Sequence, residues 1–365
     1  MPDSMRGKKK RNVTLSDIAD ICGVAKATVS YALQGNRKRM SDEVFARIHK
    51  TAAEIGYDPA IQHAARRLSW MKQGKVSINH IISLFFPPRG LSLTYFTRIF
   101  QGIMTVLTAK RFGLLMNYDN SVMRSGHLLP IFARGEVDGA IVLAEREQFQ
   151  PILESLRGLQ GFGNRPLVSL MAPLPDASSV RTDDHRGACL VAKHLLDLGH
   201  RKILFFGRDF DTHFIYGSRR QGVLDAYREA GINPQENLIE MQWEQCKLIV
   251  SETIQQRPNV FSEVTAVMAP NDQGAVWILE LLADRGLSVP QDISLTGYDD
   301  ALPVLQGNLN NFLTTVRLPL EEVGCAAARM IIELVQMRGE SEPQHNVLPV
   351  ELVLRKSTAP PKNRA

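Results

Sequence analysis

The sequence has few of the features that place a protein in a membrane or in an oxidising compartment. Its 365 residues contain no apolar run of the roughly 18 residues that a membrane span needs. No apolar segment follows the basic N-terminus, so we expect no secretory signal. The cysteines lie far apart and form neither a CxxC pair nor a zinc-type cluster: Cys22, Cys189, Cys246 and Cys325. We therefore expect a cytoplasmic protein with reduced thiols and no metal.

The sequence also lacks the motifs of common enzymes. No GxGxxG follows a strand-like segment, since Gly161-Phe162-Gly163 has no third glycine and precedes its strand. No set of nucleophile, base and orienting group stands out. We therefore expect no catalytic activity and no cofactor. Hydrophobic residues make up 44% and charged residues 22%, a mixture typical of globular domains, and the length allows one small and one large domain.

Positive charge is concentrated at the N-terminus. Residues 1–75 carry 15 Lys and Arg against 7 Asp and Glu, a net charge of +8. The remainder carries 28 against 31, a net charge of −3. A basic segment attached to a slightly acidic body indicates a segment that binds a polyanion. A charge run alone is also compatible with a solvated tail, so the pattern that follows it decides between the two.

Three short helices are expected directly after the basic residues. Thr14 and Asp17 have the spacing of a capping box, and Gly23 ends the first helix. Its apolar residues share one face: Leu15, Ile18, Ala19 and Cys22. A second helix is expected from about 25 to 33, with Val29 and Leu33 facing inward. Ser41 caps a third, whose buried face we expect to hold Val44, Phe45, Ile48, Ala52 and Ile55.

Two short helices joined by a glycine turn are typical of the helix-turn-helix, although a small helical bundle without a DNA role has the same pattern. In a helix-turn-helix the second helix enters the major groove. Lys26 would donate to guanine, and Tyr31 would hydrogen-bond or pack on a thymine methyl. The short polar side chains suit phosphates, namely Thr28, Ser30 and Gln34.

From about residue 78 the pattern changes to short apolar runs that alternate with helical stretches. We expect strands at 80–86, 114–118, 140–143, 167–171, 202–207, 266–268 and 293–297, with a helix over 93–111. This alternation predicts βαβ units around parallel sheets. Some 280 residues exceed one sheet, so we expect two similar lobes with a cleft between them. Ligands of such sheets bind beyond the carboxyl ends of the strands.

The N-terminal segments resemble the signature of the lac repressor family: 13–19, Gly23-Val24, Thr28-Val29-Ser30 and 53–59. The resemblance implies that Lys26, Ala27 and Tyr31 read bases. It also implies that residues 64–68 form a hinge helix, whose Leu68 wedges into the minor groove of DNA when two copies meet. One departure from the family is that Leu68 lies further from Pro59 than the usual spacing. The alternative is that Leu68 is an ordinary apolar residue of the linker.

The resemblance continues through the body, where eight further segments follow in the family's order. Among them are Val137-Asp138-Gly139, Leu198-Gly199-His200, Ala269-Pro270-Asn271-Asp272 and Gly297-Tyr298-Asp299-Asp300. It implies a core of two Rossmann-like lobes of the periplasmic-binding-protein type I kind. It also implies that Arg219, Asn271 and Asp299 hydrogen-bond an effector in the cleft, and that Trp243 stacks on it.

Each of these residues also has a purely structural interpretation. Asp299 is then a helix cap, Arg219 a salt-bridge residue and Trp243 a core residue. His213, in a loop, is either a contact for an acidic ligand group or, as is more common for a lone histidine, incidental. Phe86 is either an apolar lip that packs on the ligand or a core residue. Met171 stands where sugar-binding members place an aspartate, which argues against a simple hexose as the ligand.

Taken with the resemblance, the sequence predicts a transcriptional regulator, most simply a repressor. It would bind a pseudo-palindromic operator as a homodimer at the nucleoid, and a small polar effector, sugar or sugar derivative, would control its affinity for DNA. The alternative is a solute-binding protein with the same lobes, which the basic head disfavours. We expect a basic tail at 1–12, a DNA-binding domain at 13–58, a hinge and linker at 59–77, an effector and dimerisation domain at 78–356, and a flexible tail at 357–365.

Overall fold

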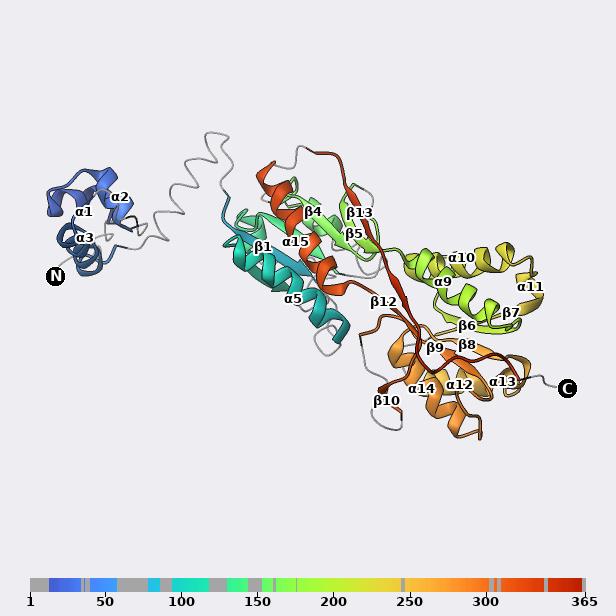
Figure 1. The fold of residues 1–365 in the computed structure, drawn as a ribbon. Coiled ribbons are helices and arrows are strands. Elements are labelled where there is room, and N and C mark those ends of the chain that lie inside the picture. The colour runs from blue at the N-terminus through green and yellow to red at the C-terminus, as the bar shows by residue number, and fades with distance from the viewer. Residues whose placement is uncertain are drawn as a thin grey trace, which may run out of the picture. The chain divides into compact units, whose positions relative to one another are not determined.

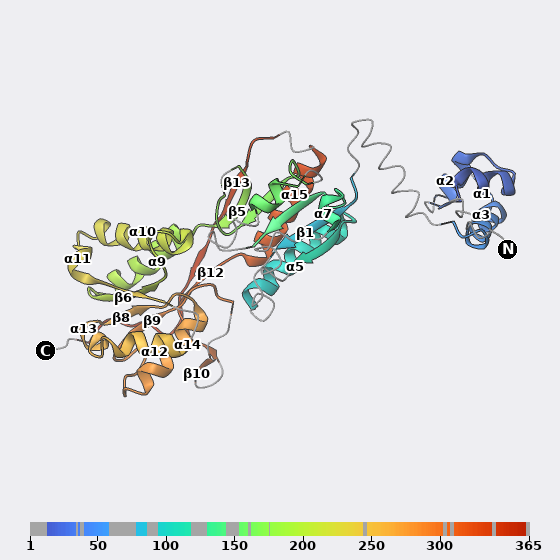
Figure 2. The same ribbon diagram turned by 180° about the vertical axis from the view of Figure 1, so that it is seen from behind.

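The computed structural model describes the chain as two compact units, residues 1–77 and 78–365. The residues described are 13–33, 36, 40–57, 78–85, 94–117, 130–143, 153–159, 162–174, 176–243, 247–301, 305–306, 310–337 and 341–362. Each unit is built around its own core. Figures 1 and 2 show their elements from opposite sides.

Among its described residues, the N-terminal unit has three helices that pack together: α1 (Leu15–Cys22), α2 (Lys26–Leu33) and α3 (Asp42–Glu54). The apolar face predicted for α1 is buried as expected. On α2, however, the fully buried residues are Val29 and Ala32, and Leu33 is only half-buried against them. On α3, Ile48, Thr51 and Ala52 are buried while the outer apolar residues pack at the margin. The difference arises because so small a core encloses only the residues nearest its centre.

The second unit contains two parallel sheets, as predicted. The larger one, here called the N sheet, has the strand order β13-β5-β4-β3-β1-β2. Its strands are β1 (Ile81–Phe85), β2 (Gly113–Asn117), β3 (Gly139–Val142), β4 (Leu167–Leu170), β5 (Ser178–Thr182) and β13 (His345–Leu348). The smaller one, the C sheet, has the order β7-β6-β8-β9. Its strands are β6 (Ile203–Gly207), β7 (Leu238–Gln242), β8 (Ala266–Met268) and β9 (Ser294–Thr296).

Helices cover these sheets and define two lobes. The N lobe carries α5 (Thr94–Ala109) and α15 (Leu320–Gln336), which pack side by side on the N sheet, with the short α7 (Pro130–Ala133) (Figure 1). The C lobe carries α9 (Asp184–Asp197), α10 (Phe214–Glu229), α11 (Pro234–Asn237), α12 (Lys247–Gln255), α13 (Val260–Glu263) and α14 (Asp272–Ala283). In both sheets the first strand lies between the second and the third, so each has a point where the strand order reverses and where ligands of such folds bind.

The chain passes between the lobes after β5, after β9 and again after β13. Small antiparallel pairs accompany these passages: β12 (Thr315–Arg317) with β14 (Glu351–Val353), and β10 (Leu305–Gln306) with β11 (Asn310–Asn311). Short strands of this kind escaped the sequence analysis, because two- and three-residue segments carry no detectable periodicity.

The C-terminal segment differs from the expectation of a flexible tail at 357–365. Through residue 362 it is packed on the C lobe. The buried hydroxyl of Ser357 donates to the Leu295 carbonyl at 2.6 Å and accepts from the Thr314 amide at 2.8 Å. Lys362 pairs with Asp292 at 2.8 Å. The polar, proline-rich composition indicated a free end, but here hydroxyl groups satisfy buried backbone groups instead.

The contact between α5 and α15 depends on the absence of a side chain. A Cβ at Gly102 would collide with the backbone carbonyl oxygen of Glu321, and Gly324 faces the Ile99 carbonyl in the same way. Backbone cannot yield as a flexible side chain does, so the two helices approach closely only with glycine at both positions.

Gly102→Val should therefore separate α5 from α15 and destabilise the core domain by about 1–3 kcal/mol or more. Chemical denaturation monitored by circular dichroism measures the loss. Thr105→Val, on the exposed side of the same helix, is the control and should unfold with the wild type. Equal denaturation midpoints for wild type and Gly102→Val would show that the contact between α5 and α15 accommodates a larger side chain.

Candidate functional site

The first candidate site is the second helix of the N-terminal unit. It is positioned by α1, which begins at the predicted capping box of Thr14 and Asp17. The Thr14 amide donates to the Asp17 carboxylate at 2.7 Å, and the Asp17 amide donates to the Thr14 hydroxyl at 3.3 Å. Gly23 closes α1 with a φ of 63°, a left-handed conformation that glycine adopts without strain. The turn then leads directly into α2.

One face of α2 remains open to solvent. Lys26 and Ala27 are exposed, Tyr31 is 43% exposed, and Thr28 and Ser30 are half-buried. The opposite face is held in place because the His49 ring lies 3.1 Å from the Ala32 carbonyl and Val29 is fully buried. The helix thus presents, on one surface, the described residues that the sequence assigned to DNA. The other two predicted DNA contacts, Gln34 and Leu68, lie outside the described residues.

The second candidate site lies where the strands of the C sheet end. Arg219 lies on α10, which follows β6. Asn271 follows β8 and caps α14, accepting from the Gly274 amide at 2.7 Å. Asp299 follows β9. The carboxyl ends of neighbouring parallel strands meet at one edge, so three residues far apart in sequence come together as the cleft rule predicts.

Arg219 is the centre of this cluster and is almost fully buried. Its Nε donates to Asp184 Oδ1 at 2.7 Å, and its Nη1 donates to the Pro270 carbonyl at 2.7 Å. Its Nη2 lies 3.8 Å from Asp299 Oδ1, and its guanidinium carbon lies 3.5 Å from the centre of the Tyr298 ring. Burial alone would lower the pKa of Arg219, but Asp184, Tyr298 and Asp299 raise it by more, so the side chain stays charged.

Asp299 is the strained member of the cluster. Its φ is 101°, and the φ of the next residue, Asp300, is 48°, both unusual for residues other than glycine. Burial raises the pKa of Asp299 well above its ordinary value. Arg219 lowers it, while Asp272 and Asp184 raise it further. The contact with Arg219 is too long for a direct hydrogen bond, which leaves a carboxylate able to accept from a ligand hydroxyl.

Several members of this cluster were not identified from the sequence. Asp184 pairs with Arg219 and accepts from the Thr182 hydroxyl at 3.0 Å. Asp272 accepts from the Thr315 hydroxyl at 2.7 Å and the Ala301 amide at 3.0 Å. Asp184 opens α9 and Asp272 opens α14, so from sequence each has the pattern of a helix-capping acid and nothing more.

Tyr95 extends the cluster to the N lobe. It lies in the first turn of α5, and burial raises its pKa, with Asp299 and Asp184 raising it further. The Tyr95 ring packs against Phe96 edge to face at 5.1 Å. From sequence, a tyrosine next to a phenylalanine in an apolar helix indicates core packing. Only the fold shows that the charges of two carboxylates in the other lobe act on the Tyr95 hydroxyl.

Trp243, which follows β7, is 1% exposed. Its ring stacks on Trp277 at 5.4 Å and meets the edge of Phe206 at 6.1 Å. Its Nε1 is buried and has no hydrogen-bond partner among the described residues. The packing is that of a core residue, whereas the unpaired N–H is a group that a ligand would satisfy.

The remaining predicted residues lie at the margin. His213 is the N-cap of α10, with its ring 4.9 Å from that of Tyr216. Phe86 lies outside the described residues, and its neighbour Phe85 is fully buried in the N lobe.

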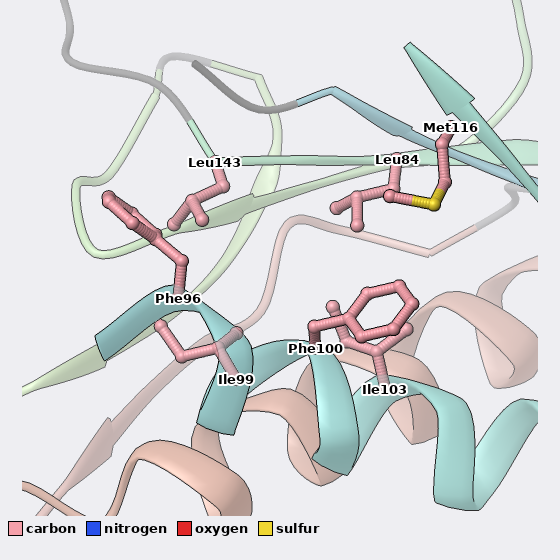
Figure 3. A pocket seen from close by; sticks show the side chains of 7 residues that line it. All are labelled: Leu84, Phe96, Ile99, Phe100, Ile103, Met116 and Leu143. Atoms are coloured by element: carbon pink, nitrogen blue, oxygen red, sulfur yellow. The ribbon is translucent and has the colours of Figure 1, made fainter. Parts of the chain in front are cut away.

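An apolar pocket lies beside the N-lobe end of this cluster. Figure 3 shows the side chains of α5 facing those of the N sheet across it. It has room for about 10 Å³, one water-sized group. Its lining is entirely apolar: Leu84, Phe96, Ile99, Phe100, Ile103, Met116 and Leu143. It adjoins the polar cluster through the contact of Phe96 with Tyr95.

Within the described residues, no group of three or more His, Cys, Asp or Glu side chains is arranged to hold a metal ion. Over the same residues, none of the helices combines the length and apolarity that crossing a bilayer requires.

A helix-turn-helix joined to a two-lobed core with a polar cluster at its strand ends defines a class: regulators that read DNA with one unit and bind a ligand with the other. Residues 14–60 match the family described as bacterial regulatory proteins, lacI family. Residues 192–358 match the periplasmic binding protein-like domain. The chain thus combines a DNA-binding domain of the lacI family with a periplasmic binding protein-like domain, and it is a DNA-binding transcriptional regulator.

Named relatives and a solved structure agree with this assignment. The chain is 29% identical to the arabinose metabolism transcriptional repressor of Geobacillus stearothermophilus, over 74% of this chain and 76% of that protein. It is 28% identical to the transcriptional repressor PurR of Edwardsiella ictaluri, over 95% and 97%. A LacI family regulator of Enterococcus faecium, solved with bound ribose, superposes with a TM-score of 0.64 at 26% identity, over 77% of this chain and all of that one. These relatives are regulators rather than enzymes, and the fold class predicted from sequence is confirmed.

Asp299→Asn should make the protein more resistant to heat at neutral and alkaline pH. The folded-state pKa of Asp299 is raised, so its contribution to stability is fully present below the unfolded pKa of about 3.9 and is lost as pH rises through the folded pKa. Asparagine does not ionise, so the variant does not lose this stability as the pH rises. The Tm advantage of the variant should grow from pH 4.5 to 8.5 in differential scanning calorimetry. A variant that is less stable than wild type at pH 8.5 would show that the Arg219 attraction outweighs burial.

Proposed function

We propose that this chain represses transcription by binding a pseudo-palindromic operator as a homodimer, and that a sugar or sugar derivative in the cleft controls its affinity for that operator. The observation that carries the proposal is the pairing of an exposed α2 surface with a buried cluster of one guanidinium and several carboxylates. The first suits base edges and phosphates, and the second suits a ligand rich in hydroxyl groups.

For the DNA-binding unit, we infer that Lys26, Ala27 and Tyr31 contact bases and that Thr28, Ser30 and Gln34 contact phosphates. Leu68 would wedge into the minor groove from the hinge. The exposure of Lys26 and Tyr31 on one face of α2 supports the inferred base contacts. A homodimer follows from DNA geometry, because two heads that read a pseudo-palindrome need a two-fold axis.

For the core, we infer that Arg219, Asn271 and Asp299 bind the effector, with Trp243, His213 and Phe86 at its edges. Ribose bound to the Enterococcus faecium regulator, and the arabinose metabolism named for the Geobacillus repressor, favour a sugar. Met171 is buried and offers no hydrogen-bond acceptor at the end of β4, which favours a ligand other than a simple hexose.

We further propose a division of the chain into functional segments, with no catalytic activity in any of them. Residues 13–58 form the DNA-binding domain after a basic segment at 1–12, and 59–77 form the hinge and linker. Residues 78–356 form the effector-binding and dimerisation domain, against which the following segment packs. The protein then acts in the cytoplasm, at operator sites on the nucleoid.

Lys26→Ala should change which operator bases are preferred. Selection of random duplexes by the full-length protein gives the wild-type preference, and the variant should lose about tenfold discrimination at the contacted base pair. Lys50→Ala removes the same charge from an exposed site on α3 and should keep the wild-type preference. If the wild type selects no sequence at low ionic strength, the proposed function is wrong.

Asp299→Ala should abolish effector binding and spare operator binding. A panel of pentoses, hexoses, disaccharides, sugar phosphates and nucleobases is screened by thermal shift, in which a ligand of the native state raises the Tm by mass action. The sugar that raises the Tm of wild type should no longer raise the Tm of the variant. Asp211→Ala, whose carboxylate is 95% exposed, should retain the shift. Loss of operator binding together with the shift would mean that Asp299 is structural.

A further inference from the structure

A buried carboxylate lies at the point where the chain enters the core from the linker. Asp138 is 0% exposed and comes directly before β3. The backbone amide of Asn79 lies 2.9 Å from both of its oxygens, and the amide of Ile81 donates to Oδ2 at 3.0 Å. The Asn79 side chain adds a bond to Oδ1 at 3.1 Å. Thus the first residues of the second unit are bound by one side chain 57 or more positions away.

The geometry of this anchor is determined from several directions. Arg165 Nη1 lies 3.6 Å from Asp138 Oδ1 and balances its charge. The Asp138 amide in turn donates to the Ile81 carbonyl at 2.8 Å. Between the two anchored amides, His80 has a φ of 63°, a left-handed conformation that its surroundings must impose. This turn allows two amides so near in sequence to converge on one carboxylate.

The position of the anchor relates it to the effector cluster. β1 begins at the anchored Ile81 and pairs in parallel with β2 and β3 along its length. Five residues at about 3.3 Å each span roughly 17 Å, so one rigid strand leads from the anchor to the opposite edge of the N sheet. Tyr95 lies in the first turn of α5, which follows β1, and the charges of Asp299 and Asp184 in the C lobe raise its pKa.

We propose that Asp138 is a positioning residue for allosteric coupling, on the basis of the proposed function. It touches neither DNA nor effector. It holds residues 79–81 rigidly to the N sheet, so that a movement of the N lobe on effector binding is passed to residues 58–77 and the DNA-binding unit. Without the anchor, the chain pivots at Asn79 and the movement of the lobe is not transmitted.

The test compares effector affinity and operator affinity in the full-length protein. Asp138→Asn keeps the volume of the side chain but removes the charge and one acceptor oxygen. The sugar that gives the largest thermal shift with wild type is the probe, and the selected duplex is the operator. We expect the variant to bind the sugar within twofold of wild type, while the factor by which the sugar changes operator affinity falls about threefold or more.

Two further variants separate positioning from stability. Asn79→Ala removes only the side-chain bonds to Asp138 and Gly135, and should reduce the coupling factor by less than Asp138→Asn does. Glu136→Gln breaks an exposed ion pair with Arg134 two positions away and should leave sugar affinity, operator affinity and coupling unchanged. Hydrogen exchange should show faster exchange at the Asn79 and Ile81 amides of Asp138→Asn, with cleft segments unchanged.

The outcomes are distinct. Unchanged coupling in a stable Asp138→Asn protein overturns the inference, as does loss of sugar binding together with coupling, which would make the residue structural. If wild type itself binds no duplex selectively, or no sugar alters that binding, the proposed function fails and the inference with it.

Discussion

The core of this regulator depends on one buried guanidinium. Arg219 draws its partners from separate parts of the chain: Asp184 after β5, Pro270 after β8, and Tyr298 and Asp299 after β9. A buried cation left without these partners is unfavourable by several kcal/mol, so the segments must meet wherever Arg219 lies. Two of those segments carry the chain between the lobes. The same interaction that satisfies a buried charge therefore lies where the chain passes between the lobes.

The cluster is held in its arrangement at some cost to stability. Asp299 combines a left-handed backbone with a carboxylate whose pKa burial raises well above its ordinary value. Strained backbone and poorly solvated charge persist only where the surroundings hold them in place, and they concentrate at functional sites. Asp300, next in sequence, accepts from Arg355 at 2.7 Å and from Arg317 at 2.8 Å. One carboxylate thus faces the cluster while its neighbour ties together the segments that pass between the lobes.

The parallel sheets separate the two tasks of the core by distance. All strands of the N sheet run the same way, so every carboxyl end lies at one edge and every amino end at the other. The first edge faces the polar cluster around Arg219, and at the second edge Asp138 holds the first residues of the core. β1 and β3, whose residues are almost all buried between these edges, deform little because their side chains are densely packed.

Part of this structure could be predicted from the sequence because it depends on residues that are neighbours in the chain. The capping box of Thr14 and Asp17 and the turn at Gly23 follow from neighbouring residues, and the buried runs of β1, β3, β6 and β8 follow from their length and composition. Arg219, Asn271 and Asp299 were identified through the resemblance to the family. Asp184, Asp272 and Tyr95 were not, because a helix-capping acid and an aromatic pair have the same local pattern whether or not they face a ligand.

The sequence by itself therefore determined the class of each element and the division into a basic helical head and an α/β body, since these depend on composition and short-range periodicity. Only the tertiary structure decided which polar side chains share a site and that Asp138 holds the entrance to the core. Those contacts join residues tens of positions apart, and no local pattern records a distance in space.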